Sequence, residues 1–163
     1  MKFIIFNPNI DFINKISKLF NKNSKCFFNN FGLGNKETKL KYYHECQSFV
    51  NRELNLYNNK NISLFNIKTG EYYCNENNIK YIDFLKIDSE GYELNILRGL
   101  NLNKYRPNYM LIEVYKVDYN NIVEFLKENN YNLICNFTNY SKKTNPCWDG
   151  THNDYLFMNN QFQ

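Results

Sequence analysis

The chain has 163 residues, a length that suits one domain built on a single hydrophobic core. Charged residues make up 22% of the sequence and the net charge is only +4 with no basic cluster, so we expect no nucleic-acid partner. Alanine is absent and about one residue in five is asparagine, but aromatic residues at 18% supply ample core material, which excludes a disordered chain.

The five cysteines and two histidines give no sign of structural zinc, because no two cysteines are close enough in sequence to form a CxxC pair. An odd number of cysteines without a secretion signal indicates a reducing compartment. No segment approaches the length of a membrane-spanning helix. We therefore expect a cytoplasmic protein that does not bind a membrane.

Hydrophobic periodicity predicts strands and helices in alternation along the chain. Strands are expected at 2–6, 26–30, 37–43, 62–68, 81–87, 109–115, 131–137 and 154–158. Helices are expected at 12–20, 69–77, 92–100 and 119–126, with Asn9 and Asp118 as N-caps of the first and last. The remaining segments are a turn at Gly32 and Gly34 and polar loops at 44–61 and 138–152. This alternation predicts a parallel sheet with helices on both faces, and the apolar run 109–115 predicts an interior strand buried on both sides.

Three acids follow the strand at 81–87 within six residues, namely Asp88, Glu90 and Glu93. Ligands of open α/β sheets bind at the carboxyl ends of strands, so Asp88 and Glu90 are candidates for chemistry. A carboxylate there can take a proton from a substrate hydroxyl or hold a ligand by hydrogen bonds, and Gly91 lets the backbone turn tightly. The alternative is that Asp88 only caps the next helix.

Lys86 and Glu93 are both expected to face the core, which predicts a structural ion pair between them. Glu113, inside the next strand, is the other candidate partner of Lys86. A divalent cation held by Asp88, Glu90 and Glu113 is conceivable, since hard cations bind clustered carboxylates. The positive charge of Lys86 opposes such a site, and we expect no metal.

The stretch FLKIDSEGYELNILRGL, followed by RPNYMLIEVY and later by NDYLFM, resembles the FkbM-type methyltransferases. That family carries a K-I-D-x-E-G-x-E signature, which matches Lys86 to Glu93. The segment IFNPNIDFINKISKLF is similar to the family's second strand and helix, and NNFGLGNKETKL to its third strand and turn. The resemblance implies an α/β fold over residues 1–163, a Rossmann-like class I methyltransferase sheet with helices on both faces, truncated at the first strand-helix unit.

By this resemblance the activity is transfer of a methyl group from S-adenosylmethionine to a hydroxyl of a sugar or small metabolite. Asp88 and Glu113 are the implied catalytic residues, and Asn7, Asp88 and Glu90 are the implied cofactor-binding residues. Asn7 stands where the family carries the acid that holds the ribose hydroxyls. Asn can still hydrogen-bond a hydroxyl, although without a charge-assisted bond.

The family's glycine-rich first strand and turn, which cradles the methionine part of the cofactor, has no counterpart before Phe3. This departure keeps a second interpretation open, a catalytically impaired remnant that acts as a binding module for a glycan, a small molecule or a partner enzyme. A third is an enzyme that needs a missing N-terminal segment from an upstream reading frame or another chain. A metal-dependent glycan-processing enzyme is a weaker alternative, and a homodimer that covers the exposed sheet edge is compatible with the pattern.

Overall fold

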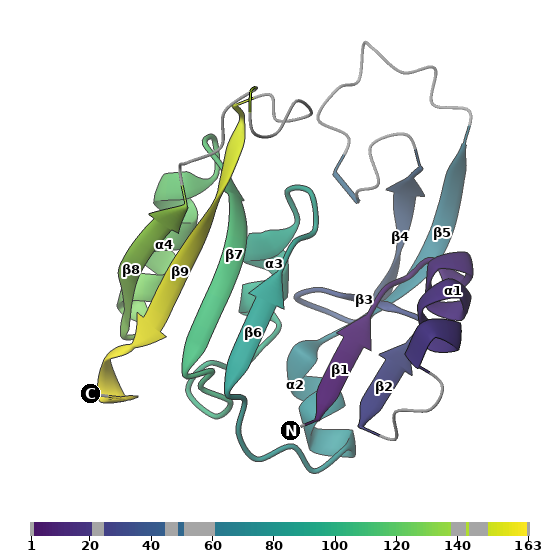
Figure 1. Ribbon diagram of the computed structural model, residues 1–163, viewed down its shortest axis with the longest axis horizontal. Coiled ribbons are helices and arrows are strands. Elements are labelled where there is room, and N and C mark those ends of the chain that lie inside the picture. The colour runs from purple at the N-terminus through teal and green to yellow at the C-terminus, as the bar shows by residue number, and fades with distance from the viewer. Residues whose placement is uncertain are drawn as a thin grey trace.

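The computed structural model describes residues 2–20, 25–44, 49–50, 61–137, 143 and 150–162. Figure 1 shows how their strands and helices are arranged. In chain order the elements are β1 (Phe3–Phe6), α1 (Ile10–Phe20), β2 (Cys26–Asn29), β3 (Gly32–Leu33), β4 (Thr38–Tyr43), β5 (Ile62–Lys68), α2 (Gly70–Glu76), β6 (Phe84–Ile87), α3 (Glu93–Arg98), β7 (Tyr109–Tyr115), α4 (Tyr119–Glu128), β8 (Tyr131–Phe137), β9 (His152–Asn159) and the 3₁₀ turn η1 (Asn160–Phe162).

The described strands form three sheets. β1 and β2 pair in parallel, and β5 lies between β3, which is parallel to it, and β4, which is antiparallel. The third sheet has the order β6-β7-β9-β8, with β6 and β7 parallel and β9 antiparallel to both of its neighbours. The prediction of a parallel sheet is therefore wrong for β4 and β9, whereas β8 pairs antiparallel with β9 and runs in the same direction as β7. The sequence at 138–152 carries no helical pattern, and strands joined without a crossover helix pair antiparallel.

The main core lies between the four-stranded sheet and the helices α3 and α4, which cover one face of it (Figure 1). Met110, Ile112 and Val114 of β7 face these helices and are buried, as are Ile122 and Leu126 of α4. Each fully buried side chain of this kind contributes about 1.5–3 kcal/mol to stability. In the part of the chain that the structure describes, no helix covers the opposite face of this sheet (Figure 1).

The uncovered face corrects two expectations about β7 and its sheet. The intervening residues of β7 are only half-buried, so the strand alternates between a core face and an open face and is not buried on both sides. Helices on both faces of the four-stranded sheet were also expected, and the described helices lie on one. The apolar run at 109–115 misled the prediction because Tyr109 and Tyr115, on the open face, read as core residues.

Helix starts follow the expected capping chemistry in part. Asn9 caps α1, since its Oδ1 accepts hydrogen bonds from the backbone N–H groups of Asp11 (3.0 Å) and Phe12 (3.4 Å). Thr69 caps α2 by accepting from the N–H of Tyr72 at 3.0 Å. Asp118 occupies the N-cap position of α4, as predicted, but its side chain makes no capping hydrogen bond.

The end of α3 touches the loop after β3 directly. A Cβ atom added at Gly99 would lie 1.8 Å from the carbonyl oxygen of Gly34, so no side chain fits there. The predicted turn at Gly32 and Gly34 is wrong for Gly32, because Gly32 and Leu33 form β3 and pair with Ile67 and Lys68. The contact between Gly99 and Gly34 connects α3, and with it the four-stranded sheet, to the rest of the molecule.

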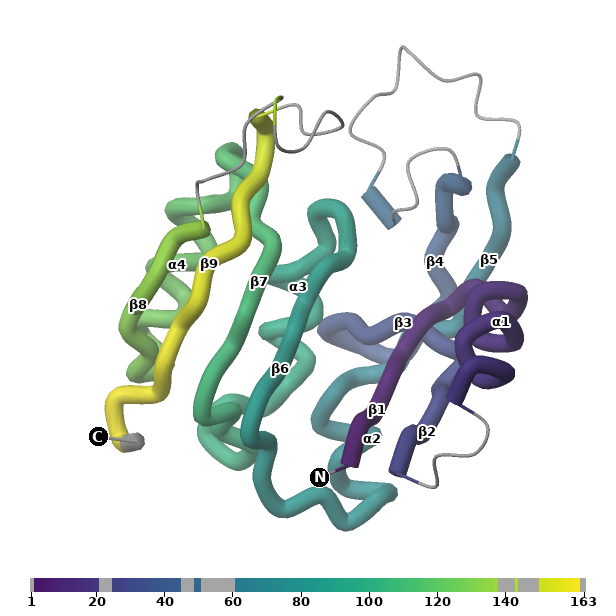
Figure 2. The backbone as a smooth tube through the Cα atoms, viewed as in Figure 1, coloured from purple at the N-terminus to yellow at the C-terminus, as the bar shows by residue number. Residues whose placement is uncertain are grey.

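The backbone trace shows β1 and β6 side by side and running in the same direction (Figure 2). The predicted loops at 44–61 and 138–152 fall largely outside the described residues, except that His152 belongs to β9. Along the described chain, no helix combines the length and the apolar character needed to span a membrane.

Candidate active site

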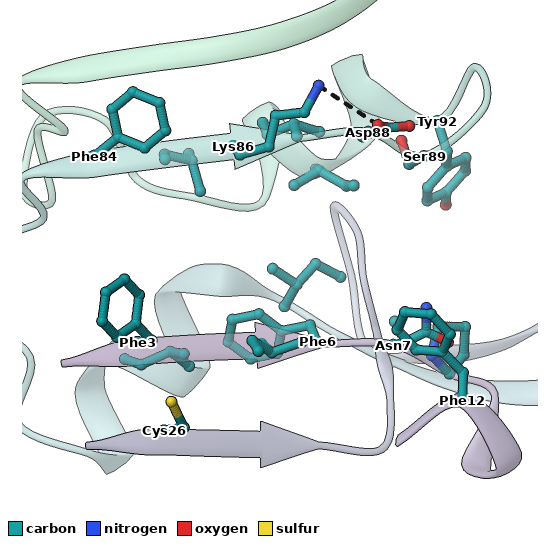
Figure 3. Close-up of a pocket in the computed structure, with 18 of the residues that line it drawn as sticks. Phe3, Phe6, Asn7, Phe12, Cys26, Phe84, Lys86, Asp88, Ser89 and Tyr92 are labelled. Carbon is teal, nitrogen blue, oxygen red and sulfur yellow. Dashed lines mark ion pairs between the residues drawn. The ribbon is translucent and has the colours of Figure 1, made fainter. Parts of the chain in front are cut away.

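A cavity of about 800 Å³ opens between β1 and β6 (Figure 3). Its walls along the two strands are mostly apolar, with Phe3 and Phe6 on one side and Phe84 and Ile87 on the other. Its polar end lies where both strands finish, and it is lined there by Asn7, Asp88 and Ser89. This is the end of the strands at which α/β sheets collect ligands.

Asn7 and Asp88, two of the residues implied in cofactor binding, therefore line one cavity from opposite strands (Figure 3). The Oδ1 of Asn7 accepts a hydrogen bond from the N–H of Asn9 at 2.9 Å. This bond orients the carboxamide at the start of α1. Its oxygen has a second lone pair and its nitrogen carries two N–H groups, so the side chain can still accept and donate hydrogen bonds.

The turn from β6 into α3 has an uncommon backbone conformation. Glu90 has φ 55° and Gly91 has φ 100°, both in the left-handed region. The expectation that Gly91 permits a tight turn is confirmed, because a residue with a side chain is strained at that angle. A left-handed non-glycine residue such as Glu90 costs of the order of 1–3 kcal/mol and is held there by its surroundings.

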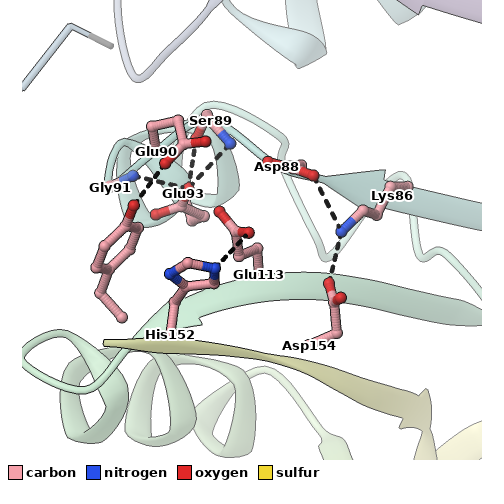
Figure 4. A network of polar contacts seen from close by, with 10 residues as sticks. Lys86, Asp88, Ser89, Glu90, Gly91, Glu93, Glu113, His152 and Asp154 are labelled. Atoms are coloured by element: carbon pink, nitrogen blue, oxygen red, sulfur yellow. Dashed lines mark hydrogen bonds and ion pairs between the residues drawn. The ribbon is translucent and has the colours of Figure 1, made fainter. Parts of the chain in front are cut away.

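Glu93 fixes this turn from inside the protein (Figure 4). Its side chain is buried, and its Oε1 accepts hydrogen bonds from Ser89 N–H (3.0 Å), Ser89 O–H (2.8 Å) and Gly91 N–H (3.0 Å). A carboxylate that gathers three donors holds the backbone of the turn in one conformation. Glu93 is thus a structural residue, as expected. It bonds to Ser89 and Gly91, however, and not to Lys86 as predicted.

The predicted ion pair between Lys86 and Glu93 is wrong. Lys86 Nζ donates to Asp154 Oδ1 at 2.6 Å and lies 3.5 Å from Asp88 Oδ2. Leu85 and Ile87 face α3 and the core, so the alternate residue Lys86 points to the open face of the sheet, away from Glu93. Burial alone would lower the pKa of Lys86, but the hydrogen bond to Asp154 and the charge of Asp88 raise it overall.

Asp88 does not cap α3. The N-cap position belongs to Tyr92, which makes no side-chain capping bond, and the Asp88 side chain remains 48% exposed beside Lys86. The alternative prediction, that Asp88 only caps the next helix, is therefore wrong. Its carboxylate lines the polar end of the cavity.

Asp88, Glu90 and Glu113 come together at the carboxyl ends of β6 and β7 (Figure 4). One carboxylate oxygen from each lies within 4.8 Å of the others. Glu113 is half-buried, and its Oε2 is buried without a hydrogen-bond partner among the described residues. Burial, and then the charges of Asp88 and Glu90, raise the pKa of Glu113 to about 8.

Two residues that the sequence did not single out complete the surroundings of these acids. His152 Nε2 lies 3.5 Å from Glu113 Oε1, and the Tyr115 hydroxyl donates to Glu90 Oε2 at 2.5 Å. His152 was expected in a loop, so its place opposite Tyr115 in the β7–β9 ladder was missed. The period-two alternation of Asp154 and Leu156, extended back by two residues, puts His152 on the same face and could have revealed it.

Glu90 and Glu113 do not line the cavity between β1 and β6. Glu90 turns its carboxylate toward Tyr115, and Glu113 stands one strand further from β1. The three acids match the donor set of a hard cation, but the ammonium group of Lys86 is 3.5 Å from Asp88. That no metal binds here stays a prediction.

The described fold also occurs in a solved methyltransferase structure. The crystal structure of Methyltransferase FkbM from Methylobacillus flagellatus KT aligns with 96% of this chain at a TM-score of 0.59 and 13% sequence identity, which shows a shared fold. The present chain spans 36% of that protein's length. No curated protein matches the sequence. A family model, the Methyltransferase FkbM domain, matches residues 1–133, and the chain therefore belongs to the FkbM methyltransferase family.

Proposed function

We propose that this chain transfers a methyl group from S-adenosylmethionine to a hydroxyl group of a sugar or small metabolite. The observation that carries the proposal is the group of Asp88, Glu90 and Glu113, set at the carboxyl ends of β6 and β7 in an FkbM methyltransferase fold. The acids lie next to the polar end of a cavity large enough for a small molecule.

The residues around the polar end fit the chemistry of this cofactor. Asp88, which lines the cavity, would face its positive charge, with Glu90 in the same group of acids behind it, and the Asn7 carboxamide can hydrogen-bond a ribose hydroxyl. When bound, S-adenosylmethionine supplies a methyl group that is already activated by a positively charged sulfur. The protein then has to position the acceptor hydroxyl and remove its proton.

Glu113 is the proposed proton acceptor. Its pKa of about 8 lies close to neutral pH, where a general base works best. The side chain is half-buried, and one of its oxygens lies within 4.8 Å of oxygens of Asp88 and Glu90. His152, 3.5 Å away, can hold the Glu113 carboxylate in one orientation. Asp88, which is exposed, would orient the acceptor hydroxyl by a hydrogen bond.

The direct test is a methyl-transfer assay with a radiolabelled methyl group, S-adenosylmethionine and a panel of sugars, together with calorimetric titration of the cofactor. Glu113→Gln and Asp88→Asn should each lower the rate by about 100-fold or more. Glu124→Gln makes the same chemical change on the exposed side of α4 and should leave the rate within about twofold of the parent. Unchanged rates for both site variants would contradict the proposed roles.

One observation favours a second interpretation, in which the chain needs a further polypeptide segment. Among the described strands, β1 pairs with β2 alone and β6 with β7 alone, so the edges that face each other across the cavity have no partner. A chain in this state would bind the cofactor weakly until that position is filled. The cytoplasmic location and the homodimer stay predictions.

A further inference from the structure

Asp154 of β9 is two strands away from Asp88 in the sheet order β6-β7-β9, yet both side chains contact the same ammonium group (Figure 4). Lys86 Nζ donates to Asp154 Oδ1 at 2.6 Å and lies 3.5 Å from Asp88 Oδ2. Neighbouring strands are about 4.8 Å apart, so the Lys86 side chain has to extend over β7 to reach Asp154. The long aliphatic stem of a lysine allows this while its ammonium group stays among polar groups.

The register of the strands explains why these groups meet. Glu113 of β7 lies directly opposite Asp154 of β9, and on the other side of β7 the residue before Glu113 lies opposite Ile87. Asp88 follows Ile87, so Asp88, Glu113 and Asp154 stand at one level across three adjacent strands. Like charges that face each other across a sheet repel. Lys86 therefore brings a positive charge to a row of three acids.

The ion pair with Lys86 restrains a side chain that the turn after β6 does not hold. Glu93 bonds to Ser89 and Gly91 and fixes the backbone of that turn. The Asp88 side chain is 48% exposed, and the described contact that restrains it is the ion pair with Lys86. An isolated exposed ion pair contributes little, because the ordering of two flexible side chains offsets their attraction.

Asp154 reduces this ordering cost. Its side chain is only 21% exposed, and β9 has a neighbouring strand on each side, so Asp154 offers the ammonium group a fixed acceptor. The lysine side chain is then already ordered where it meets Asp88. Burial opposes the charged form of Lys86, but the hydrogen bond to Asp154 and the charge of Asp88 raise its pKa overall, so the lysine keeps its positive charge.

We propose that Asp154 is a positioning residue, which acts through Lys86 to hold the Asp88 carboxylate in one orientation at the polar end of the cavity. The contribution of that orientation to catalysis rests on the proposed function, in which Asp88 orients the acceptor hydroxyl, whereas the orientation itself does not. Asp154 does not line the cavity. Its effect on a ligand therefore passes through Lys86 and Asp88.

The first test measures the orientation of Asp88 without any catalysis. In the ¹⁵N- and ¹³C-labelled full chain, three-bond couplings to the carboxyl carbon report whether Asp88 occupies one χ1 rotamer or several. We expect one rotamer in the parent protein and averaged couplings in Asp154→Asn. Lys86→Met keeps the length of the stem without the charge and should also give averaged couplings.

Two further variants serve as controls for the coupling measurement. Asp154→Glu keeps a carboxylate within reach of Lys86, and it should keep Asp88 in one rotamer. Asp83→Asn makes the same chemical change as Asp154→Asn at an exposed residue just before β6, and it should leave the couplings unchanged.

The second test is a double-mutant cycle in the methyl-transfer assay. Asp154→Asn should lower the rate by about tenfold in the parent protein, because a misplaced carboxylate no longer orients the acceptor. In the Asp88→Asn background the same substitution should lower the rate by less than about twofold, because the group that Asp154 positions is already lost. A substitution that only weakens the fold lowers both rates by the same factor. Lys86→Met takes the place of Asp154→Asn in both tests if Asp154→Asn does not fold.

The two tests together separate this proposal from the methyl-transfer function. Averaged couplings for Asp88 in the parent protein, or a single rotamer that survives both Asp154→Asn and Lys86→Met, overturn the positioning role. Equal losses of rate in the two backgrounds also overturn it. A single rotamer that is lost in Asp154→Asn, in a protein that transfers no methyl group, supports the positioning role and contradicts only the proposed function.

Discussion

Glu113 carries a half-buried acidic group whose ionisation opposes folding. Its pKa is about 8 in the folded protein against an ordinary value of 4.5, and burial is the main cause. At a pH below 4.5 the carboxyl group is protonated in both the folded and the unfolded protein. Between pH 4.5 and about 8 the folded protein binds more protons than the unfolded protein, so the contribution of this group to stability is lost as the pH rises.

We predict that Glu113→Gln becomes progressively more stable than the parent protein as the pH rises from about 5 to 9. The glutamine keeps the shape of the side chain and cannot ionise. Urea denaturation at several pH values measures the difference in the free energy of unfolding. Glu124→Gln, an exposed position, should show no such trend, and parallel curves for Glu113→Gln and the parent would contradict the raised pKa.

Glu93 holds the turn that carries Asp88 and Glu90. In Glu93→Ala the N–H groups of Ser89 and Gly91 lose their acceptor, and we expect a loss of about 2–4 kcal/mol in the free energy of unfolding. Glu93→Gln retains an acceptor oxygen and should lose less. Chemical denaturation of both variants checks the order, and equal losses would show that the three hydrogen bonds contribute little.

The carboxylates of Asp88, Glu90 and Glu113 also permit a test of the metal hypothesis. Since Lys86 already provides a positive charge beside Asp88, we expect the melting temperature to be unaffected by a chelator. The measurement is a thermal melt with and without chelator, and with added Mg²⁺ or Mn²⁺. A melting temperature that falls with chelator and recovers with one of these ions would support a cation site at Asp88, Glu90 and Glu113.

The sequence predicted correctly where the acids lie along the chain, but it did not predict which side chains they contact. Asp88, Glu90 and Glu113 follow or end strands that were predicted at the right positions, so their meeting at one edge follows from the topology. Lys86 was assigned to the core because period two tells which residues share a face and not which face the helices cover. The period-two pattern around Asp154 could have placed His152 on the right face, but its position opposite Tyr115 depends on a long-range antiparallel pairing that no local pattern encodes.

At the scale of elements, the contact between α3 and the loop after β3 requires Gly99. A methyl group there would meet the Gly34 carbonyl oxygen at 1.8 Å, and a backbone atom cannot rotate away as a side chain can. We predict that Gly99→Ala lowers the free energy of unfolding by about 3 kcal/mol. The measurement is equilibrium denaturation.

Gly70→Ala is the matched control for Gly99→Ala. Its Cβ would lie 3.1 Å from the flexible Leu100 Cδ1, and alanine favours the helical conformation that Gly70 adopts in α2. The change should be within about 1 kcal/mol of the parent. Equal stability of the two variants would contradict a fixed contact between α3 and the loop after β3.

Most elements were predicted from the sequence to within a few residues, but their assembly was not. Capping by Asn9 and the alternation in β5 are local features, and local features determine where helices and strands begin. The division into three sheets depends on which edges meet in space. Gly32 shows the difference, because a glycine between two apolar residues indicated a turn while its pairing with Ile67 makes it part of a strand.

Across the whole molecule, burial is concentrated in the half that contains β6 to β9. The unit of β1, α1 and β2 buries Ile13, whereas Phe12, Leu19 and Phe20 of α1 remain exposed. Few buried apolar contacts imply a low free energy of local opening. The two halves are therefore unequal in stability.

We predict that hydrogen exchange in the native state will detect this inequality. The amides of Phe3 and Asn7, although hydrogen-bonded to β2, should exchange through openings of lower free energy than those of Met110 and Ile112 in β7. The measurement is exchange under increasing denaturant. Equal opening energies would show that the molecule unfolds as one cooperative unit.

The edges of β1 and β6 that face the cavity have a consequence for the protein at high concentration. Among the described strands, neither of these edges is paired, and an unpaired strand edge can pair with a strand of another molecule. We therefore expect self-association of the protein to increase with its concentration.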